Sequence, residues 1–198
     1  MANTQTAFGF RHIGYLPGYA PDYQQLTRNI QSTYASTIGF GDPVQKSGAY
    51  IVQGAGGTNA TGTAIIDGVF VGCQLTPKGG GIPQWAPGYL GQQAAADPVA
   101  YLINAPGALF LAATLLTAIT TTNIGQTVCF NLGTASSTGG MLSGATVDQG
   151  TCTTADVKAP FKVVGLYTGV GNGSDPTSNY NWVVVTFNNQ VFKTLVGV

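Results

Sequence analysis

The side chains that could carry acid–base chemistry are few in this chain and lie far apart in the sequence. All seven acidic residues are aspartates, there is no glutamate, and His12 is the only histidine. Asp42, Asp67 and Asp97 each adjoin Gly or Pro, where Asp is favoured because its short side chain forms turns. General acid–base catalysis needs titratable groups with shifted pKa values held close together. The sequence therefore predicts a protein that is not an enzyme.

The glycine-rich and cysteine-containing segments lack the spacing of ligand-binding motifs. Residues 54–57 (GAGG) are not followed by Lys-Ser/Thr, so they predict a turn rather than a phosphate-binding loop. Cys73, Cys129 and Cys152 are an odd set without a Cys-x-x-Cys pair, which excludes a complete disulfide framework and leaves too few ligands for zinc. Buried thiols on or near strands are the favoured interpretation, and a Cys129–Cys152 bridge is the alternative. We expect no metal site and no cofactor.

The charge content points to a protein that is packed in an assembly. Charged residues make up 7% of the chain and the net charge is zero, whereas about a quarter of a typical soluble domain is charged. So little charge leaves association weakly opposed. The basic residues form no cluster in sequence, so nucleic acid is not an expected partner.

No segment predicts insertion into a membrane or secretion. The longest apolar stretch, residues 109–119, is shorter than the ~20 residues that a membrane span needs. The N-terminus has no positively charged start followed by an apolar core, so it does not resemble a secretion signal. We expect no membrane partner, and we expect assembly in a cytoplasm.

The elements that must position these residues are predicted to be short strands. With 29 glycines and many turn-forming residues between apolar runs, the chain favours an all-β sandwich or small barrel. Long polar loops are expected at residues 133–154 and 168–179. Asp67-Gly68 and Asn188-Asn189 are expected to be tight hairpin turns. The candidate strands are residues 49–53, 63–66, 69–75, 99–103, 109–112, 127–132, 161–167, 182–187 and 190–193.

Two aromatic segments stand out from this strand pattern. Residues 1–45 are rich in Phe and Tyr without a sustained period, which predicts an irregular N-terminal arm with a short helix over 26–34, followed by a sandwich domain over 46–198. Two placements fit the arm: it wraps its own domain, or it lies on a neighbouring subunit. Residues 83–89 hold Trp85 and Tyr89 near prolines, which predicts a stiff subunit-contact loop in preference to a sugar platform.

Several segments, in this order, resemble the cement (decoration) proteins of tailed bacteriophage heads. The N-terminal part of the match comprises residues 1–3 (MAN) and 7–11 (AFGFR), 41–44 (GDPV), 68–72 (GVFVG) and the loop around Trp85 and Tyr89. The remainder comprises residues 97–102 (DPVAYL) leading into 109–110 (LF), then 160–167 (PFKVVGLY), 182–189 (WVVVTFNN) and 197–198 (GV). Each motif alone is weak, and their order extends over nearly the whole chain.

The resemblance implies a jelly-roll-like β-sandwich on the outer surface of the virion, where it docks on the assembled capsid shell and bridges neighbouring capsomers. The implied partners are the major capsid protein and the chain itself, with a homodimer favoured and a trimer possible. A tail, fibre or outer-knob component that contacts the host surface is the alternative. The expected capsid or subunit interface consists of Phe8, Phe10, Arg11, His12, Tyr15, Tyr19, Tyr23, Trp85 and Tyr89.

Overall fold

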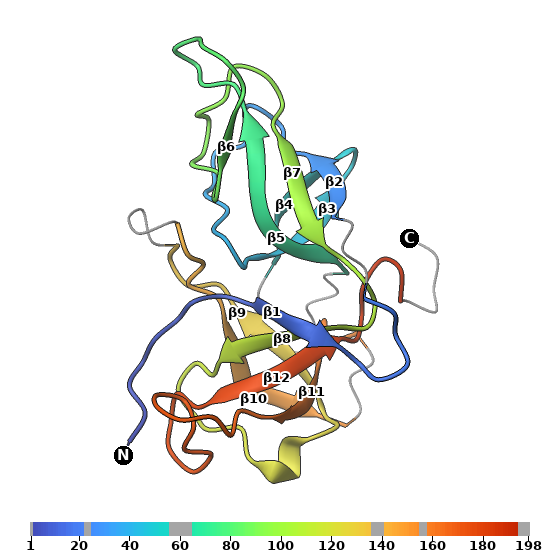
Figure 1. Cartoon of the computed structure of the whole chain (residues 1–198), viewed down its shortest axis with the longest axis vertical. Coiled ribbons are helices and arrows are strands. Elements are labelled where there is room, and N and C mark those ends of the chain that lie inside the picture. The colour runs from blue at the N-terminus through green and yellow to red at the C-terminus, as the bar shows by residue number, and fades with distance from the viewer. Residues whose placement is uncertain (1, 22–24, 56–64, 136–140, 155–157, 194–198) are drawn as a thin grey trace.

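The computed structural model describes residues 2–21, 25–55, 65–135, 141–154 and 158–193 (Figure 1). These residues form twelve strands and one 3-10 turn, η1 (Thr121–Asn123). The strands form two six-stranded sheets that pack together, which confirms the predicted all-β sandwich class. The jelly-roll connectivity stays a prediction.

The first sheet lies in the lower half of Figure 1 and is antiparallel throughout. Its strand order is β1 (Arg11–Tyr15), β8 (Ala108–Ala113), β12 (Trp182–Phe187), β11 (Phe161–Leu166), β9 (Thr127–Asn131) and β10 (Thr146–Thr153). A bridge between Thr114 and Val147 brings the end of β8 to β10. This sheet therefore curls until its edge strand β10 lies next to the end of β8, and β1 stays outside the closed part.

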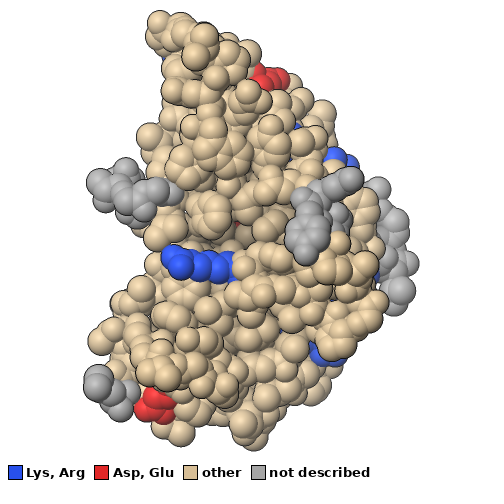
Figure 2. Space-filling model, viewed as in Figure 1, with Lys and Arg blue, Asp and Glu red and all other residues tan. Residues whose placement is uncertain are grey.

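The second sheet lies in the upper half of Figure 1. Its strand order is β3 (Pro43–Ser47), β4 (Tyr50–Gln53), β2 (Leu26–Asn29), β7 (Val99–Ile103), β5 (Ile66–Leu75) and β6 (Gln84–Ala86). Because β3 also pairs with β5, five of these strands close on one another and β6 remains at an edge. Charged side chains are sparse on the face shown in Figure 2, as the composition implies.

The predicted strands agree with the structure where an apolar run is buried. The bounds of β7 and β12 match the prediction, and β4, β8, β9 and β11 differ from it by one residue at one or both ends. The strands predicted separately at 63–66 and 69–75 are joined in the single strand β5. The predicted loop 133–154 instead contains β10, a Thr-rich strand. Its threonines favour a strand, but Asp148 and Gly150 are turn-forming residues that hide the strand in the sequence.

Three local predictions are wrong. Residues 26–29 form β2 instead of the start of a helix, because β7 pairs with them along their whole length. Asp67 and Gly68 lie inside β5 instead of forming a turn, and the buried Asp67 carboxylate accepts a hydrogen bond from Arg28 Nε at 2.7 Å. Residues 190–193 form a turn, with Gln190 bridging to Ile66, instead of the second strand of a hairpin.

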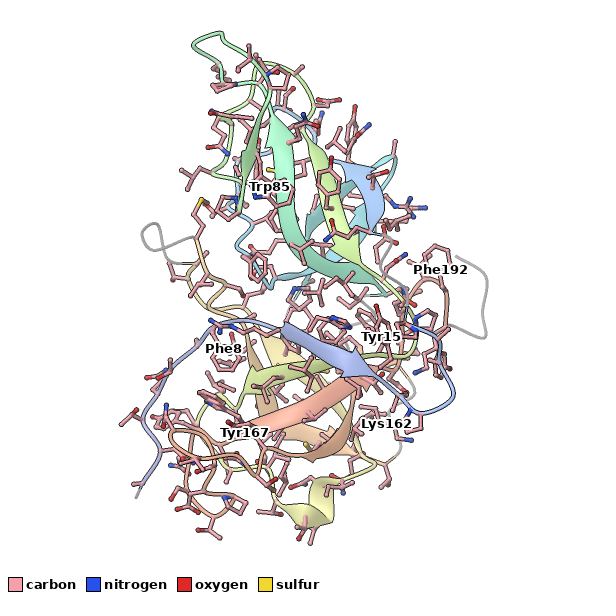
Figure 3. All side chains as sticks on the ribbon, in the orientation of Figure 1. Phe8, Tyr15, Trp85, Lys162, Tyr167 and Phe192 are labelled. Carbon is pink, nitrogen blue, oxygen red and sulfur yellow. The ribbon has the colours of Figure 1, made fainter. Side chains whose placement is uncertain are left out.

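The division of the chain into an arm over 1–45 and a domain over 46–198 also needs correction. β1 and β2 lie wholly within residues 1–45 and β3 begins there, and the three strands contribute to both sheets. Phe8 lies before the start of β1, and Tyr15 is the last residue of that strand (Figure 3). The sequence hides these strands because each is only four or five residues long, and the β1 ladder is interrupted between His12 and Gly14.

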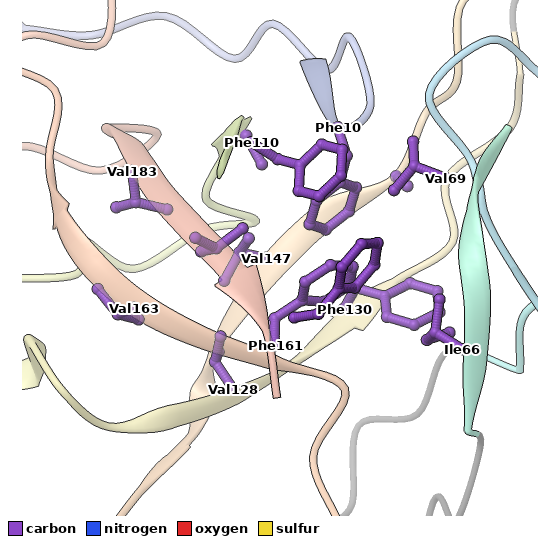
Figure 4. Packing of buried hydrophobic residues seen from close by; sticks show 14 of the residues in the cluster. Phe10, Ile66, Val69, Phe110, Val128, Phe130, Val147, Phe161, Val163 and Val183 are labelled. Carbon is purple, nitrogen blue, oxygen red and sulfur yellow. The ribbon is translucent and has the colours of Figure 1, made fainter. Parts of the chain in front are cut away.

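Five phenylalanines form the centre of the larger core (Figure 4). Phe161 lies among the other four, stacked on Phe10 at 4.4 Å and on Phe187 at 5.7 Å between ring centroids. Phe110 and Phe130 meet it edge to face. Ile66 and Val69 reach this cluster from β5 of the other sheet. The two sheets therefore share one core, and Phe10 belongs to it.

A substitution of Phe10 tests whether the N-terminal residues are part of the core. Phe10→Ala removes a fully buried ring, so we expect a loss of about 3–5 kcal/mol in the free energy of unfolding, measured by denaturant titration. The matched control is Val170→Ala, at a side chain that is 99% exposed, which should change stability by less than about 0.5 kcal/mol. A stability unchanged by Phe10→Ala would contradict this packing.

A buried carboxylate joins the two sheets at a second point. Asp42 precedes β3 and is fully buried, and its Oδ2 accepts hydrogen bonds from the Gly39 N–H at 2.7 Å and Gln53 Nε2 at 3.0 Å. Its Oδ1 accepts the hydroxyl of Ser143, which precedes β10. Burial raises the pKa of Asp42, and the hydrogen bonds from Ser143, Gly39 and Gln53 oppose that increase.

This raised pKa gives the stability of the protein a defined pH dependence. Between its ordinary value of 3.8 and its raised value, Asp42 holds more proton in the folded state than in the unfolded state. Its contribution to the unfolding free energy therefore falls as pH rises through that window. We expect the difference in unfolding free energy between the wild type and Asp42→Asn to decrease from acidic to neutral pH.

The comparison with Asp42→Asn isolates this group, because both proteins share every other titrating side chain. The variant places an amide N–H₂ against hydrogen-bond donors, which adds a cost that does not change with pH. Urea titrations of both proteins over a pH series measure the difference. A difference that stays constant, or that grows as pH rises, would show that burial does not control this carboxyl group.

Candidate interaction surface

Strand β1 is an edge strand with a concave surface beside it that is polar and apolar in equal parts. Within the described residues β1 pairs with β8 on one side and with no strand on the other. Residues 12–19 and Pro21 line an open concavity of about 590 Å³. Ile13 is 52% exposed there, and Tyr19 is 48% exposed. We name this region, residues 11–21, the β1 surface.

His12 contributes an uncharged ring to the β1 surface. Its imidazole meets the Tyr15 ring edge to face at 4.8 Å between centroids and the Phe110 ring at 5.9 Å. Its Nε2 is buried without a hydrogen-bond partner in the described chain. Burial lowers the pKa of His12, and a backbone hydrogen bond with Gly14 acts in the opposite direction. The ring is therefore neutral at neutral pH, which suits an aromatic contact.

Tyr19 is held rigidly although half of it is exposed. A Cβ atom on Gly107 would lie 2.3 Å from the Tyr19 ring, so the ring rests directly on the backbone of the β7–β8 connection. The Leu16 N–H donates to the Gly107 carbonyl at 2.8 Å and holds the loop on the same connection. A rigid aromatic side chain loses little conformational entropy when a partner covers it.

Arg11 lies at the start of β1 and carries the only charge within the β1 surface. Its guanidinium lies over the Phe8 ring at 4.9 Å from the centroid. Phe8 in turn meets Trp182 edge to face at 4.9 Å. This cation–π contact fixes the Arg11 head group at one end of the β1 surface.

Trp85 forms a separate exposed aromatic site in the second sheet. It is 55% exposed on β6, and its ring centroid lies 5.3 Å from that of Tyr101. A Cβ on Gly72 would lie 2.2 Å from the indole, so the ring lies against the bare backbone at an irregularity of the β5–β7 ladder. Trp85 is therefore a preorganised exposed aromatic group.

The structure separates the nine expected interface residues into several groups. His12, Tyr15 and Tyr19 line the β1 surface with Arg11 beside them, and Trp85 lies in the other sheet. Tyr23 lies outside the described residues. Phe8, Phe10 and Tyr89 are buried in the chain itself, so their assignment to an intermolecular interface is corrected.

Tyr89 shows that an aromatic residue in a loop is not by itself evidence of an interface. The side chain is fully buried, and its hydroxyl donates to the Tyr34 carbonyl at 3.0 Å and accepts the Gln92 N–H at 3.0 Å. Burial is the main reason that the pKa of Tyr89 is raised. Sequence reasoning missed Ile13 in β1 and Leu16 just after it, because exposed aliphatic residues look like core residues in the sequence.

The three cysteines are thiols, as the favoured interpretation predicted. Cys73 and Cys129 are buried, Cys152 is half-buried, and no disulfide links them. Burial raises the pKa of Cys73 to about 12 and, together with Asp148 and Cys129, that of Cys152 to about 11. Both thiols are therefore protonated at neutral pH and are poor nucleophiles. Across the described ranges no three His, Cys, Asp or Glu side chains gather into a metal-binding group.

Comparisons with known proteins identify no relative. The sequence matches no family model, no curated protein and no solved structure. Among the residues that the structure describes, no helix is long and apolar enough to cross a membrane.

The support of Trp85 by Gly72 can be tested directly. Gly72 has φ +138°, and a Cβ there would overlap the indole, so Gly72→Ala should displace Trp85 and destabilise the protein by about 1–3 kcal/mol. We expect the tryptophan emission to change, and we expect that change to vanish when Trp85→Phe is added. Gly79→Ala is the matched control, because its Cβ meets nothing within 4 Å. Equal effects of the two glycine variants would contradict this support.

Proposed function

We propose that this chain is a structural virion protein that docks on the assembled phage capsid shell and bridges neighbouring capsomers. The observation that carries the proposal is the β1 surface, where an edge strand borders an open concavity lined by uncharged residues. Monomeric proteins usually cover or charge such an edge, because its backbone N–H and C=O groups can pair with another chain. The resemblance of the ordered sequence segments to phage cement proteins supports the choice of partner.

The chemistry of the β1 surface suits a protein partner. Strand addition at a sheet edge gives affinity through backbone hydrogen bonds, and pockets beside it select side chains. Tyr19 and the neutral His12 ring supply rigid aromatic area, and Arg11 supplies one oriented cation. Tyr and Arg are enriched among the residues that contribute most to binding. A segment of the major capsid protein is the proposed occupant.

Bridging follows when one molecule contacts more than one capsomer. Individually weak contacts strengthen one another once the first has formed, because the second becomes intramolecular. A protein that binds the assembled shell but not its free subunits stabilises the shell by mass action. We place the chain on the outer surface of the virion, with self-association into a homodimer or trimer as part of the same proposal.

A charge introduced into the β1 surface tests this function. Ile13→Asp buries an unpaired carboxylate in the proposed interface, so we expect binding to purified shells to weaken at least about tenfold. The folded protein should melt as the wild type does, because Ile13 is half exposed. Co-sedimentation of labelled protein with shells measures the binding.

The matched control is Ile82→Asp, which places the same charge at an 83% exposed isoleucine outside the β1 surface. Its binding to shells should equal that of the wild type. Equal binding by Ile13→Asp and the wild type would exclude the β1 surface, and no binding by the wild type would exclude the cement function.

A tail, fibre or outer-knob component remains the second candidate, because Trp85 is a preorganised exposed aromatic group in the other sheet. A flat indole with a tyrosine beside it suits contact with a receptor or glycan. Binding of the isolated protein to host cells, together with no binding to shells, would favour this candidate.

A further inference from the structure

Residues 2–9 form no strand and lie along a loop of their own chain between β11 and β12. Asn3 is the main contact, and the residue is buried, with 9% of its surface exposed. Its Nδ2 donates to the Asp175 carbonyl at 2.8 Å, and its Oδ1 accepts the Gly173 N–H at 2.9 Å. One amide side chain therefore binds both a donor and an acceptor of the loop backbone.

The side chain of Asn172 in the loop binds the backbone of the segment in the same way. Asn172 Oδ1 accepts the Thr4 N–H at 2.7 Å, and Asn172 Nδ2 donates to the Thr4 carbonyl at 3.0 Å. The same Nδ2 also lies 3.2 Å from Thr6 Oγ1. Phe8 completes the contact with its ring against Trp182. The segment is therefore held by side-chain amides and one aromatic contact, without a sheet ladder.

The loop carries hydrogen bonds of its own that do not involve the segment. The Asp175 carboxylate accepts hydrogen bonds from Ser178 Oγ and from the N–H and hydroxyl of Thr177, and these lower the pKa of Asp175. The Trp182 N–H donates to the Gly173 carbonyl at 2.9 Å. These contacts within the loop do not depend on the segment.

Gly9 lies between the segment and the core. Gly9 has φ +72°, a backbone conformation that favours glycine. The next residue, Phe10, is fixed independently by its N–H donating to the Gly41 carbonyl at 2.9 Å and by its stacking on Phe161. The Phe10 contacts therefore do not involve residues 3–8.

We infer that the loop of residues 171–182 also binds residues 3–8 of a second copy of this chain, so that neighbouring copies exchange N-terminal segments. A second copy offers the same side chains, so the exchanged contacts equal the intramolecular ones and the balance depends on protein concentration. Residues 2–10 carry no charge, and Asp175 is the only charged residue of the loop. Charge repulsion therefore does not oppose the exchange. The inference goes beyond the capsid docking proposed above and does not depend on it.

Mixing two isotopic forms of the full-length protein tests the exchange. Light copies carry a photo-reactive benzophenone side chain in place of Gln5, an exposed residue between Thr4 and Thr6, and heavy copies are isotope-labelled and otherwise unchanged. After mixing, incubation and illumination, mass spectrometry assigns each cross-link to a light or a heavy loop. We expect links from light segments to heavy residues 171–182, in a share that rises with protein concentration.

A substitution in the heavy copies separates exchange from random collision. Asn172→Ala removes the side chain that binds Thr4, so links to the heavy loop should fall about tenfold. The matched control is Asn179→Ala, at an exposed asparagine of the same connection, which should leave them unchanged. Cross-links confined to light loops at every concentration, or equal heavy-loop links in both variants, would overturn the inference.

Discussion

The stacking of Phe10 on Phe161 is the contact on which the rest of the arrangement depends. It fixes the chain at the start of β1, where Phe10 also meets Phe130 edge to face at 6.1 Å between centroids. On the C-terminal side of this anchor, β1 pairs with β8 and presents the β1 surface. On the N-terminal side, Gly9 and the preceding residues turn away to the loop before β12. The buried Phe10 ring therefore lies between the two proposed contact regions, the β1 surface and residues 3–8.

The low charge content has a structural counterpart in how the two sheets are joined. Instead of a network of ion pairs, the sheets share apolar side chains of β5 and a buried carboxylate whose partners are neutral donors. Such a joint depends little on ionic strength. An assembly built from similarly neutral surfaces would also be insensitive to salt, which is consistent with a protein that remains bound to a particle.

The sequence predicted the all-β class and most buried strands because alternating or continuous apolar runs, such as those of β7 and β12, specify burial locally. It failed where pairing partners are distant in sequence. β1 and β2 are too short to show a period, and they are strands because β8 and β7 lie beside them. Asp67 resembled a turn residue, but the Arg28 guanidinium allows its carboxylate to be buried inside β5.

The same dependence on distant strands limits what the sequence says about the candidate interface. His12, Tyr15 and Tyr19 line one concavity, and their role in an interface stays a prediction. Aromatic type could not distinguish them from Phe10 and Tyr89, whose burial depends on strands far away in the chain. Glycines that accommodate rings, Gly72 under Trp85 and Gly107 under Tyr19, identify which exposed aromatics are rigid. That information exists only in the folded structure.

The measurement that tests the central claim most directly is the copy number of this chain in purified virus particles, relative to the major shell protein, by quantitative mass spectrometry. A protein that cements the shell must follow the shell lattice, so the account predicts a ratio near one or a simple fraction of it. A handful of copies per particle would instead assign the chain to the tail or a unique vertex. Absence from particles would contradict a structural role in the virion.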